Sequence, residues 1–89
     1  MNTQARPTLT QRVAWQHAAD EAVIIDLQGR RVMGLNATGS FLWGQLDGQR
    51  SVQDLAALVA TEFGVPTERA LQDVVGFLEG MSTRGFVAL

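Results

Sequence analysis

The side chains in this chain that could carry out chemistry are few. His17 is the only histidine, and there is no cysteine, lysine or tyrosine. This composition excludes thiol nucleophiles, disulfides, cysteine-based zinc sites and lysine Schiff bases. A histidine-based acid–base site would need a nucleophile and an orienting carboxylate, such as Ser40 with Asp20 or Asp26, and no local spacing assembles them. We therefore expect no catalytic residue, metal ligand or cofactor, and a protein that is not an enzyme.

The segment GLNATGSF, residues 34–41, has two glycines at the spacing of a phosphate-binding loop. That loop requires a lysine followed by a hydroxyl side chain, and Ser40 and Phe41 stand at those positions instead. We interpret the segment as a junction between a strand and a helix, in which Asn36 caps the first backbone N–H groups of the helix.

The basic residues do not form the surface that nucleic acid requires. All seven are arginine and they face nine acidic residues, for a formal charge of −2. One function class to weigh is a small winged-helix domain for DNA binding or protein interaction. The recognition helix of such a domain should expose several basic or amide side chains, and the charge balance of this chain argues against it. Arg30 and Arg31 fit equally well as a solvated hairpin tip and as partners for the carboxylate groups of a ligand.

Three extended segments precede the helices in the sequence pattern. Val13–His17 alternates in polarity, Glu21–Leu27 is rich in β-branched residues, and Arg30–Leu35 resumes the extended pattern. Gln28 and Gly29 form the two-residue interval of a tight hairpin turn. Because the second segment has apolar side chains on both faces, we expect it at the centre of the sheet, with the third segment nearer the edge.

Three helices are predicted after the sheet. Capping residues and terminal glycines give their bounds as about 36–47, 51–64 and 66–85. The fold class is therefore α+β, with a winged helix-turn-helix-like outline and an N-terminal three-stranded antiparallel sheet packed on three α-helices.

The apolar residues of the third predicted helix form two stripes, at about 100° per residue. The first stripe contains Ala70, Val74, Phe77 and Met81. The second contains Leu71, Val75, Leu78 and Ser82. The second stripe is either more core or the wall of a groove, and the sequence leaves both interpretations open.

The length of 89 residues predicts a single small domain. The polar stretch 1–11 predicts a flexible N-terminal tail, followed by one domain over 12–89. The chain has neither the apolar core of a signal peptide nor the roughly 18 apolar residues that cross a bilayer. We therefore expect a cytoplasmic protein with no membrane partner.

Three short patterns carry a resemblance to a known family. They are LN-x-T-G at Leu35, Asn36, Thr38 and Gly39; LW with DG-x-R-S-V at Leu42, Trp43 and 47–52; and DV-x-x-FL at Asp73, Val74, Phe77 and Leu78. Over about residues 20–87 the chain resembles the PqqD-like peptide chaperones, the precursor-peptide recognition elements of ribosomally synthesised, post-translationally modified peptide (RiPP) pathways. The group that assists synthesis of the cofactor PQQ usually has a Pro-Glu pair where this chain has residues 26–29. The compact hairpin resembles at least as much the stand-alone recognition proteins of lasso-peptide clusters, so the pathway stays open.

The resemblance implies a non-catalytic, peptide-binding adaptor in natural product biosynthesis. The leader region of a precursor peptide would add to the third strand, against the third helix, and be presented to a radical enzyme, a leader peptidase or a cyclase. An exposed strand edge suits this mode because its unpaired N–H and C=O groups can pair with an extended peptide, and the same edge permits a homodimer. The implied binding residues are Arg31, Val32, Met33, Gly34 and Leu35 on the strand and Leu71, Val75, Leu78 and Ser82 on the helix.

Overall fold

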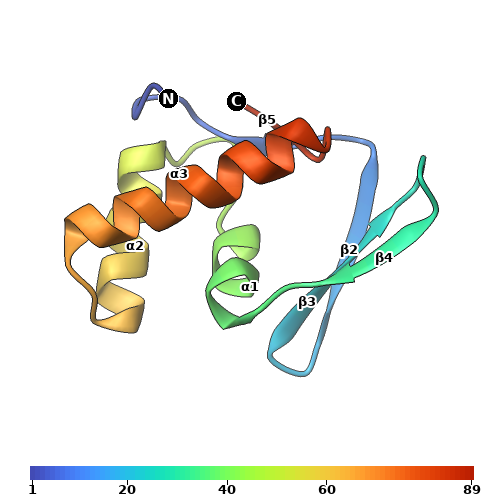
Figure 1. Cartoon of the computed structure of the whole chain (residues 1–89), viewed down its shortest axis with the longest axis horizontal. Coiled ribbons are helices and arrows are strands. Elements are labelled where there is room, and N and C mark those ends of the chain that lie inside the picture. Colours follow the sequence, from blue (N-terminus) through green and yellow to red (C-terminus); the bar gives the residue numbers. More distant parts are fainter.

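A three-stranded sheet lies beside three helices in the computed structural model, which describes all 89 residues (Figure 1). The predicted α+β class, with the sheet first and the helices after it, is confirmed. None of the three helices combines the length and apolar character needed to cross a bilayer. The elements are β1 Thr8–Leu9, β2 Val13–Ala18, β3 Glu21–Asp26, β4 Arg31–Gly34, α1 Ala37–Gly44, α2 Val52–Phe63, α3 Thr67–Thr83 and β5 Val87–Ala88.

The sheet is antiparallel with the strand order β2-β3-β4, so β3 is central and β4 is an edge, as predicted. Successive side chains of β3 point to opposite faces. Ala22 and Ile24 are buried on the face that meets the helices, and Ile25 on the other face is 38% exposed. The sheet thus contributes one face to the core.

The hairpin turn differs from its prediction. Asp26 pairs with Arg31, which leaves a four-residue loop instead of the expected two residues, Gln28 and Gly29. The left-handed residue of this loop is Arg30, at φ 55°, and Gly29 does not take a positive φ. The Asp26 carboxylate explains both changes, since it accepts hydrogen bonds from the N–H groups of Gln28 and Gly29 at 3.1 and 3.0 Å. Gly29 is required for space, because a Cβ there would collide with that carboxylate.

The helix ends follow the sequence closely, except at the C-terminus of α1. Asn36 accepts a hydrogen bond from the N–H of Gly39 at 2.8 Å, and Ser51 with Asp54 forms the predicted capping box. α2 ends at Gly64, whose left-handed φ of 65° closes the helix. Pro66 precedes α3 without a side-chain cap. α3 ends at Thr83, and the predicted terminal glycine, Gly85, takes a left-handed φ of 80° and donates its N–H to the carbonyl of Ser82 at 2.9 Å.

α1 ends at Gly44, earlier than the predicted end at Asp47 and Gly48. Asp47 is drawn out of the helix because it forms an isolated bridge with Thr8. Its carboxylate also accepts hydrogen bonds from the N–H groups of Gln49 and Arg50, which organises a turn before α2. Contacts with the N-terminal segment therefore shorten α1.

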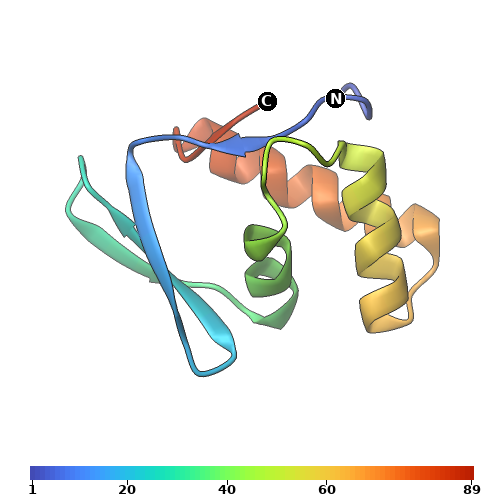
Figure 2. The ribbon, with the colours of Figure 1, turned by 180° about the vertical axis from the view of Figure 1, so that it is seen from behind.

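Residues 3–9 form a strap that pairs with distant parts of the chain, within the stretch 1–11 for which the sequence predicts a flexible tail. Thr8–Leu9 pairs with Val87–Ala88, and Figures 1 and 2 show both termini on the same side of the molecule. The carbonyl groups of Ala5 and Thr3 accept hydrogen bonds from the N–H groups of Val52 and Gln53, at 2.9 and 3.0 Å. These N–H groups begin α2 and have no partner within the helix, so the strap satisfies them.

Candidate functional site

The free edge of β4 is the first component of the site. The N–H of Leu35 bonds to the carbonyl of Ala22 at 3.0 Å, which fixes the alternation of bonds along the β3–β4 ladder. By that alternation Met33 bonds toward β3, whereas Val32 and Gly34 direct their N–H and C=O groups away from the sheet. The Val32 side chain is 71% exposed, and nothing lies within 4 Å of a Cβ placed on Gly34. β4 therefore offers an unobstructed backbone edge.

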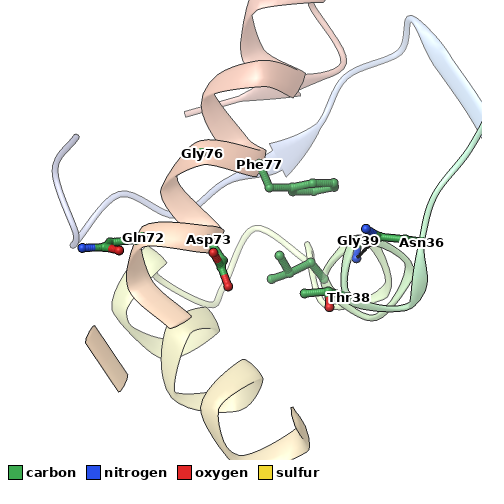
Figure 3. A pocket seen from close by; sticks show the side chains of 8 residues that line it. Asn36, Thr38, Gly39, Gln72, Asp73, Gly76 and Phe77 are labelled. Carbon is green, nitrogen blue, oxygen red and sulfur yellow. Dashed lines mark hydrogen bonds between the residues drawn. The ribbon is translucent and has the colours of Figure 1, made fainter. Parts of the chain in front are cut away.

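A cleft between the start of α1 and the middle of α3 is the second component (Figure 3). We call it the α1–α3 cleft; its volume is about 440 Å³, within the range of ligand pockets. The Phe77 ring extends from α3 toward Gly39, and its Cε1 lies 3.2 Å from where a Gly39 Cβ would stand, so glycine permits this close approach. The lining residues are Asn36, Thr38, Gly39, Leu42, Gln72, Asp73, Gly76 and Phe77.

The helical stripe predicted as a possible groove wall does not line this cleft. Leu78 is 0% exposed and belongs to the core, together with Ala70, Val74 and Met81. Leu71, Val75 and Ser82 are half-buried, and the first two pack against the core. At 100° per residue these three lie on one side of the core stripe, and Asp73 and Phe77 lie on the other.

The position of α1 explains which side of α3 borders the cleft. β4 leads through Leu35 and Asn36 directly into α1, so the first turn of α1 reaches the Asp73–Phe77 side of α3. Phe77, expected in the core stripe, is instead half-buried at the cleft. Of the strand residues expected at the site, Leu35 is 6% exposed and serves the core, whereas Met33 is half-buried.

Gly76 is a site residue that the sequence pattern did not single out. It lies inside a 17-residue helix, where glycine costs about 1 kcal/mol relative to alanine. Neither Gly76 nor Gly80 has any atom within 4 Å of an added Cβ, so packing within the chain does not require them. Two exposed glycines inside one helix are the signal in the sequence by which Gly76 could have been found.

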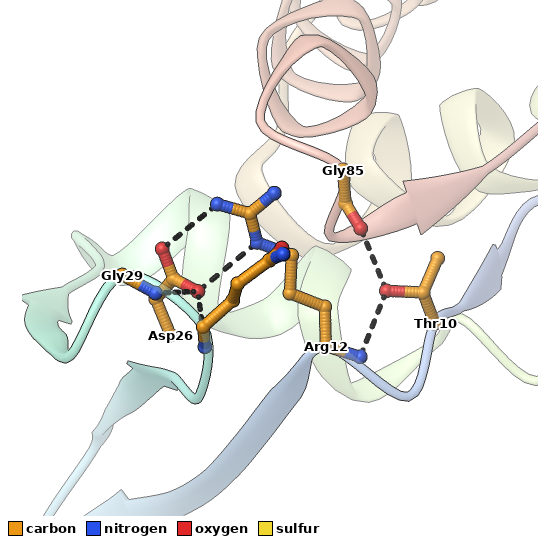
Figure 4. A network of polar contacts seen from close by, with 6 residues as sticks. Thr10, Arg12, Asp26, Gly29 and Gly85 are labelled. Atoms are coloured by element: carbon orange, nitrogen blue, oxygen red, sulfur yellow. Dashed lines mark hydrogen bonds and ion pairs between the residues drawn. The ribbon is translucent and has the colours of Figure 1, made fainter.

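A second cleft, which we call the arginine cleft, lies between the hairpin tip and the end of α3. Figure 4 shows the Arg12–Asp26 pair, which forms part of its wall. Its volume is about 300 Å³. The Arg12 guanidinium is fixed there by two bonds to the Asp26 carboxylate, at 3.0 and 3.2 Å, and its centre lies 5.7 Å from the centre of the Phe86 ring. The lining residues are Arg12, Asp26, Gly29, Arg31, Arg84 and Phe86.

The Arg12–Asp26 pair predicts acid sensitivity of the fold. The hydrogen bond from Arg12, followed by that from the N–H of Gly29, lowers the pKa of Asp26 from 3.8 to about 2. A carboxyl group whose pKa is lower in the folded state stabilises the fold above its unfolded pKa, and this contribution is lost as pH falls from about 4 to about 2. We expect the free energy of unfolding, measured with urea, to fall over this interval.

The matched control for this experiment is Asp26→Asn, which cannot titrate. Asp47 and Asp54 also have lowered pKa values, chiefly from backbone hydrogen bonds, so both proteins should lose some stability in acid. The variant should be less stable at pH 7 and should lose less between pH 4 and pH 2. Parallel pH curves would contradict the assignment.

The residues considered for catalysis occupy other roles. The Ser40 hydroxyl is buried, where it accepts a hydrogen bond from the N–H of Ala22 at 2.8 Å and donates one to the carbonyl of Leu35 at 3.1 Å. His17 is exposed on β2 and packs edge-on against Trp15 at 5.4 Å, outside both clefts. No group of three His, Cys, Asp or Glu side chains is placed to hold a metal ion. What the site offers is a backbone edge and two clefts.

A comparison with protein families identifies the family to which this chain is related. The family model for coenzyme PQQ synthesis protein D (PqqD) matches residues 21–87, from the start of β3 into β5. The chain belongs to the PqqD family. The predicted resemblance is thus confirmed, and the match includes β4, α3 and most residues of both clefts.

One curated protein and two solved structures are also similar to this chain. The PqqA binding protein of Bradyrhizobium diazoefficiens is 25% identical over 83 residues, which cover 93% of this chain and 81% of the relative. The structure of TbiB1 in complex with the TbiA(beta) leader peptide superposes with a TM-score of 0.82 at 24% identity, covering 90% of this chain and 93% of TbiB1. Lasso peptide synthetase B1 complexed with the leader peptide gives 0.84 at 19% identity, covering 96% and 100%. Both structures share the fold.

Proposed function

We propose that this PqqD-family protein binds the leader region of a ribosomal precursor peptide by strand addition to β4, against α3. The observation that carries the proposal is the free edge of Val32 and Gly34, with the arginine cleft at the start of β4 and the α1–α3 cleft, which α3 lines, beginning two residues after its end. The names of its relatives support it, since two structures are complexes with leader peptides and the curated relative is a PqqA binding protein. The winged-helix DNA-binding alternative is not favoured.

The proposed role of this protein is that of an adaptor without catalytic activity of its own. It presents the leader to a modifying enzyme, such as a radical enzyme, a leader peptidase or a cyclase, in the cytoplasm where ribosomal peptides are made. The recognition surface lies within residues 12–89, and the strap supports it by satisfying the start of α2.

The edge supplies part of the binding energy. Val32 and Gly34 each offer one N–H and one C=O, and hydrogen bonds of this kind contribute about 1 kcal/mol net each. They provide about half of the ~8 kcal/mol of a micromolar complex. Apolar burial supplies the remainder at about 25 cal/mol per Å², and it also offsets the cost of ordering a flexible peptide. Of the two apolar side chains that line the α1–α3 cleft, Phe77 is half-buried and can bury further area, whereas Leu42 is already 1% exposed.

The geometry distinguishes β4 from β2, the other edge of the sheet. The N–H of Leu27 bonds to the carbonyl of Arg12, and this alternation leaves Val13, Trp15 and His17 with outward backbone groups. No residue of β2 lines either cleft, so a peptide added there would gain backbone bonds without side-chain pockets. Strand addition uses both backbone hydrogen bonds and side-chain pockets, and β4 is the edge that offers the two together.

The variant Gly76→Ala should change the stability of the protein and its affinity for the leader in opposite directions. The added methyl group meets nothing within 4 Å, so the variant should raise the free energy of unfolding by about 0.5–1 kcal/mol. The same methyl group projects into the cleft proposed for the peptide, so leader affinity should fall by about three- to tenfold. Thermal unfolding and calorimetric titration measure the two effects.

Thr83→Ala is the matched control for this pair of measurements. Thr83 is exposed near the end of α3, on the side opposite the core, and lines neither cleft. Its replacement should not weaken leader binding. If Gly76→Ala stabilises the protein and leaves affinity unchanged, the peptide does not lie against Gly76.

The direct test of the proposed function is binding of the leader segment of a small precursor peptide encoded beside this protein's gene. We expect a complex of micromolar or higher affinity by fluorescence anisotropy, with no chemical change in the peptide by mass spectrometry. Absence of binding by the folded protein to every such leader would contradict the proposal. A concentration-dependent dimer in sedimentation experiments, dissociated by the leader, would show that the two use the same edge.

A further inference from the structure

The arginine cleft concentrates positive charge in an acidic protein. Three of the seven basic residues line it, against one of the nine acidic residues, although the whole chain carries −2. Asp26 neutralises Arg12 through their two hydrogen bonds. Arg31 and Arg84 have no acidic side chain within 4.0 Å, so their charges are uncompensated.

The arginine cleft lies at one end of the proposed peptide path. β4 begins at Arg31, which lines the arginine cleft, and ends at Gly34, two residues before Asn36 in the α1–α3 cleft. α3 follows the same course, since Phe77 borders one cleft and Arg84, just after the helix, borders the other. The four residues of β4 span about 13 Å at the usual strand rise.

The direction of an added strand then decides which part of the peptide reaches the arginines. The sheet is antiparallel throughout, and an antiparallel strand on β4 would run from the α1–α3 cleft toward Arg31. The residues that follow the paired segment of the peptide therefore arrive at Arg31 and Arg84.

On the basis of the proposed function, we propose that the arginine cleft binds a carboxylate side chain of the leader, located just C-terminal to the segment paired with β4. Guanidinium groups recognise carboxylates through paired N–H donors, and Arg31 and Arg84 have these donors free of ion pairs. Phe86, which is 3% exposed and packs against the Arg12 guanidinium, forms the apolar part of the wall. Arg12 is already held by Asp26 and orders the cleft without taking the carboxylate itself.

The test uses synthetic peptides that cover the leader encoded beside the gene, with each acidic residue in turn replaced by its amide. Fluorescence anisotropy measures their affinities for the wild type, Arg31→Gln, Arg84→Gln and the control Arg69→Gln, which is exposed on α3 outside both clefts. We expect Arg31→Gln and Arg84→Gln to weaken the unmodified peptide by about five- to tenfold at 50 mM NaCl, and less at 300 mM. Arg69→Gln should stay within twofold.

One amide replacement should weaken binding to the wild type by a similar factor and should cause no further loss with Arg84→Gln. If every amide peptide binds the wild type as tightly as the unmodified one, or if both arginine variants bind normally, the carboxylate site is overturned and the proposed function stands. If the wild type binds no leader peptide at all, the proposed function fails and this inference fails with it. Unchanged melting temperatures of the variants confirm that the fold is intact.

Discussion

Val32→Pro should abolish most leader binding and leave the fold intact. The N–H of Val32 points away from β3, so proline removes a donor from the free edge and no bond from the ladder. A bound peptide would lose that bond and would meet the proline ring at the pairing edge, which should cost about 2 kcal/mol or more, or at least about 30-fold in affinity. Calorimetric titration measures the loss, and far-UV circular dichroism monitors the fold.

His17→Pro is the matched control for the edge assignment. His17 holds the equivalent outward position on β2, at the opposite edge of the same sheet, and is also exposed. This variant should bind the leader as the wild type does. Equal binding by Val32→Pro, or loss of binding only in His17→Pro, would show that the peptide does not add to β4.

Leu78→Asp should unfold the protein. Leu78 is 0% exposed in the core between α3 and the rest of the molecule, and the variant replaces its apolar contacts with a carboxylate that has no cationic partner there. We expect a loss of about 4 kcal/mol or more, comparable with the whole stability of many small domains. Loss of the circular dichroism signal and of amide dispersion in NMR spectra would record it.

Gln72→Asp is the control for the stability effect, because it places the same charge on the exposed side of α3. It should remain folded. A folded Leu78→Asp variant that no longer binds the leader would contradict the core assignment and return Leu78 to the binding groove.

Local signals in the sequence were sufficient to predict the features in which a residue contacts only its neighbours along the chain. The Asn36 cap, the Ser51–Asp54 capping box and the left-handed Gly64 each depend on contacts within a few residues. The central place of β3 followed from apolar side chains on both faces. Six residues of the family patterns also line the α1–α3 cleft, although the patterns themselves did not indicate a cleft: Asn36, Thr38, Gly39, Leu42, Asp73 and Phe77.

The sequence could not determine features that depend on distant partners. The hairpin loop is set by Asp26, whose carboxylate bonds to the loop and to Arg12 at once. The side of α3 that borders a cleft depends on where α1 lies, and helical periodicity treats both sides of the core stripe alike. Residues 3–9 are held by Pro7, which is buried, by Ala5 and Leu9, which pack against the core, and by backbone carbonyls that bond to the start of α2. All of these contacts are with residues far away in the sequence, so local patterns did not predict them.

The central claim is strand addition at β4, and an amide-resolved NMR titration of the labelled protein with the leader segment tests it most directly. The account predicts that the Val32 and Gly34 amides shift strongly and become protected from hydrogen exchange, with further shifts at Asp73, Gly76 and Phe77. Protection confined to the outward amides of β2, or binding that leaves Val32 and Gly34 freely exchanging, would contradict it.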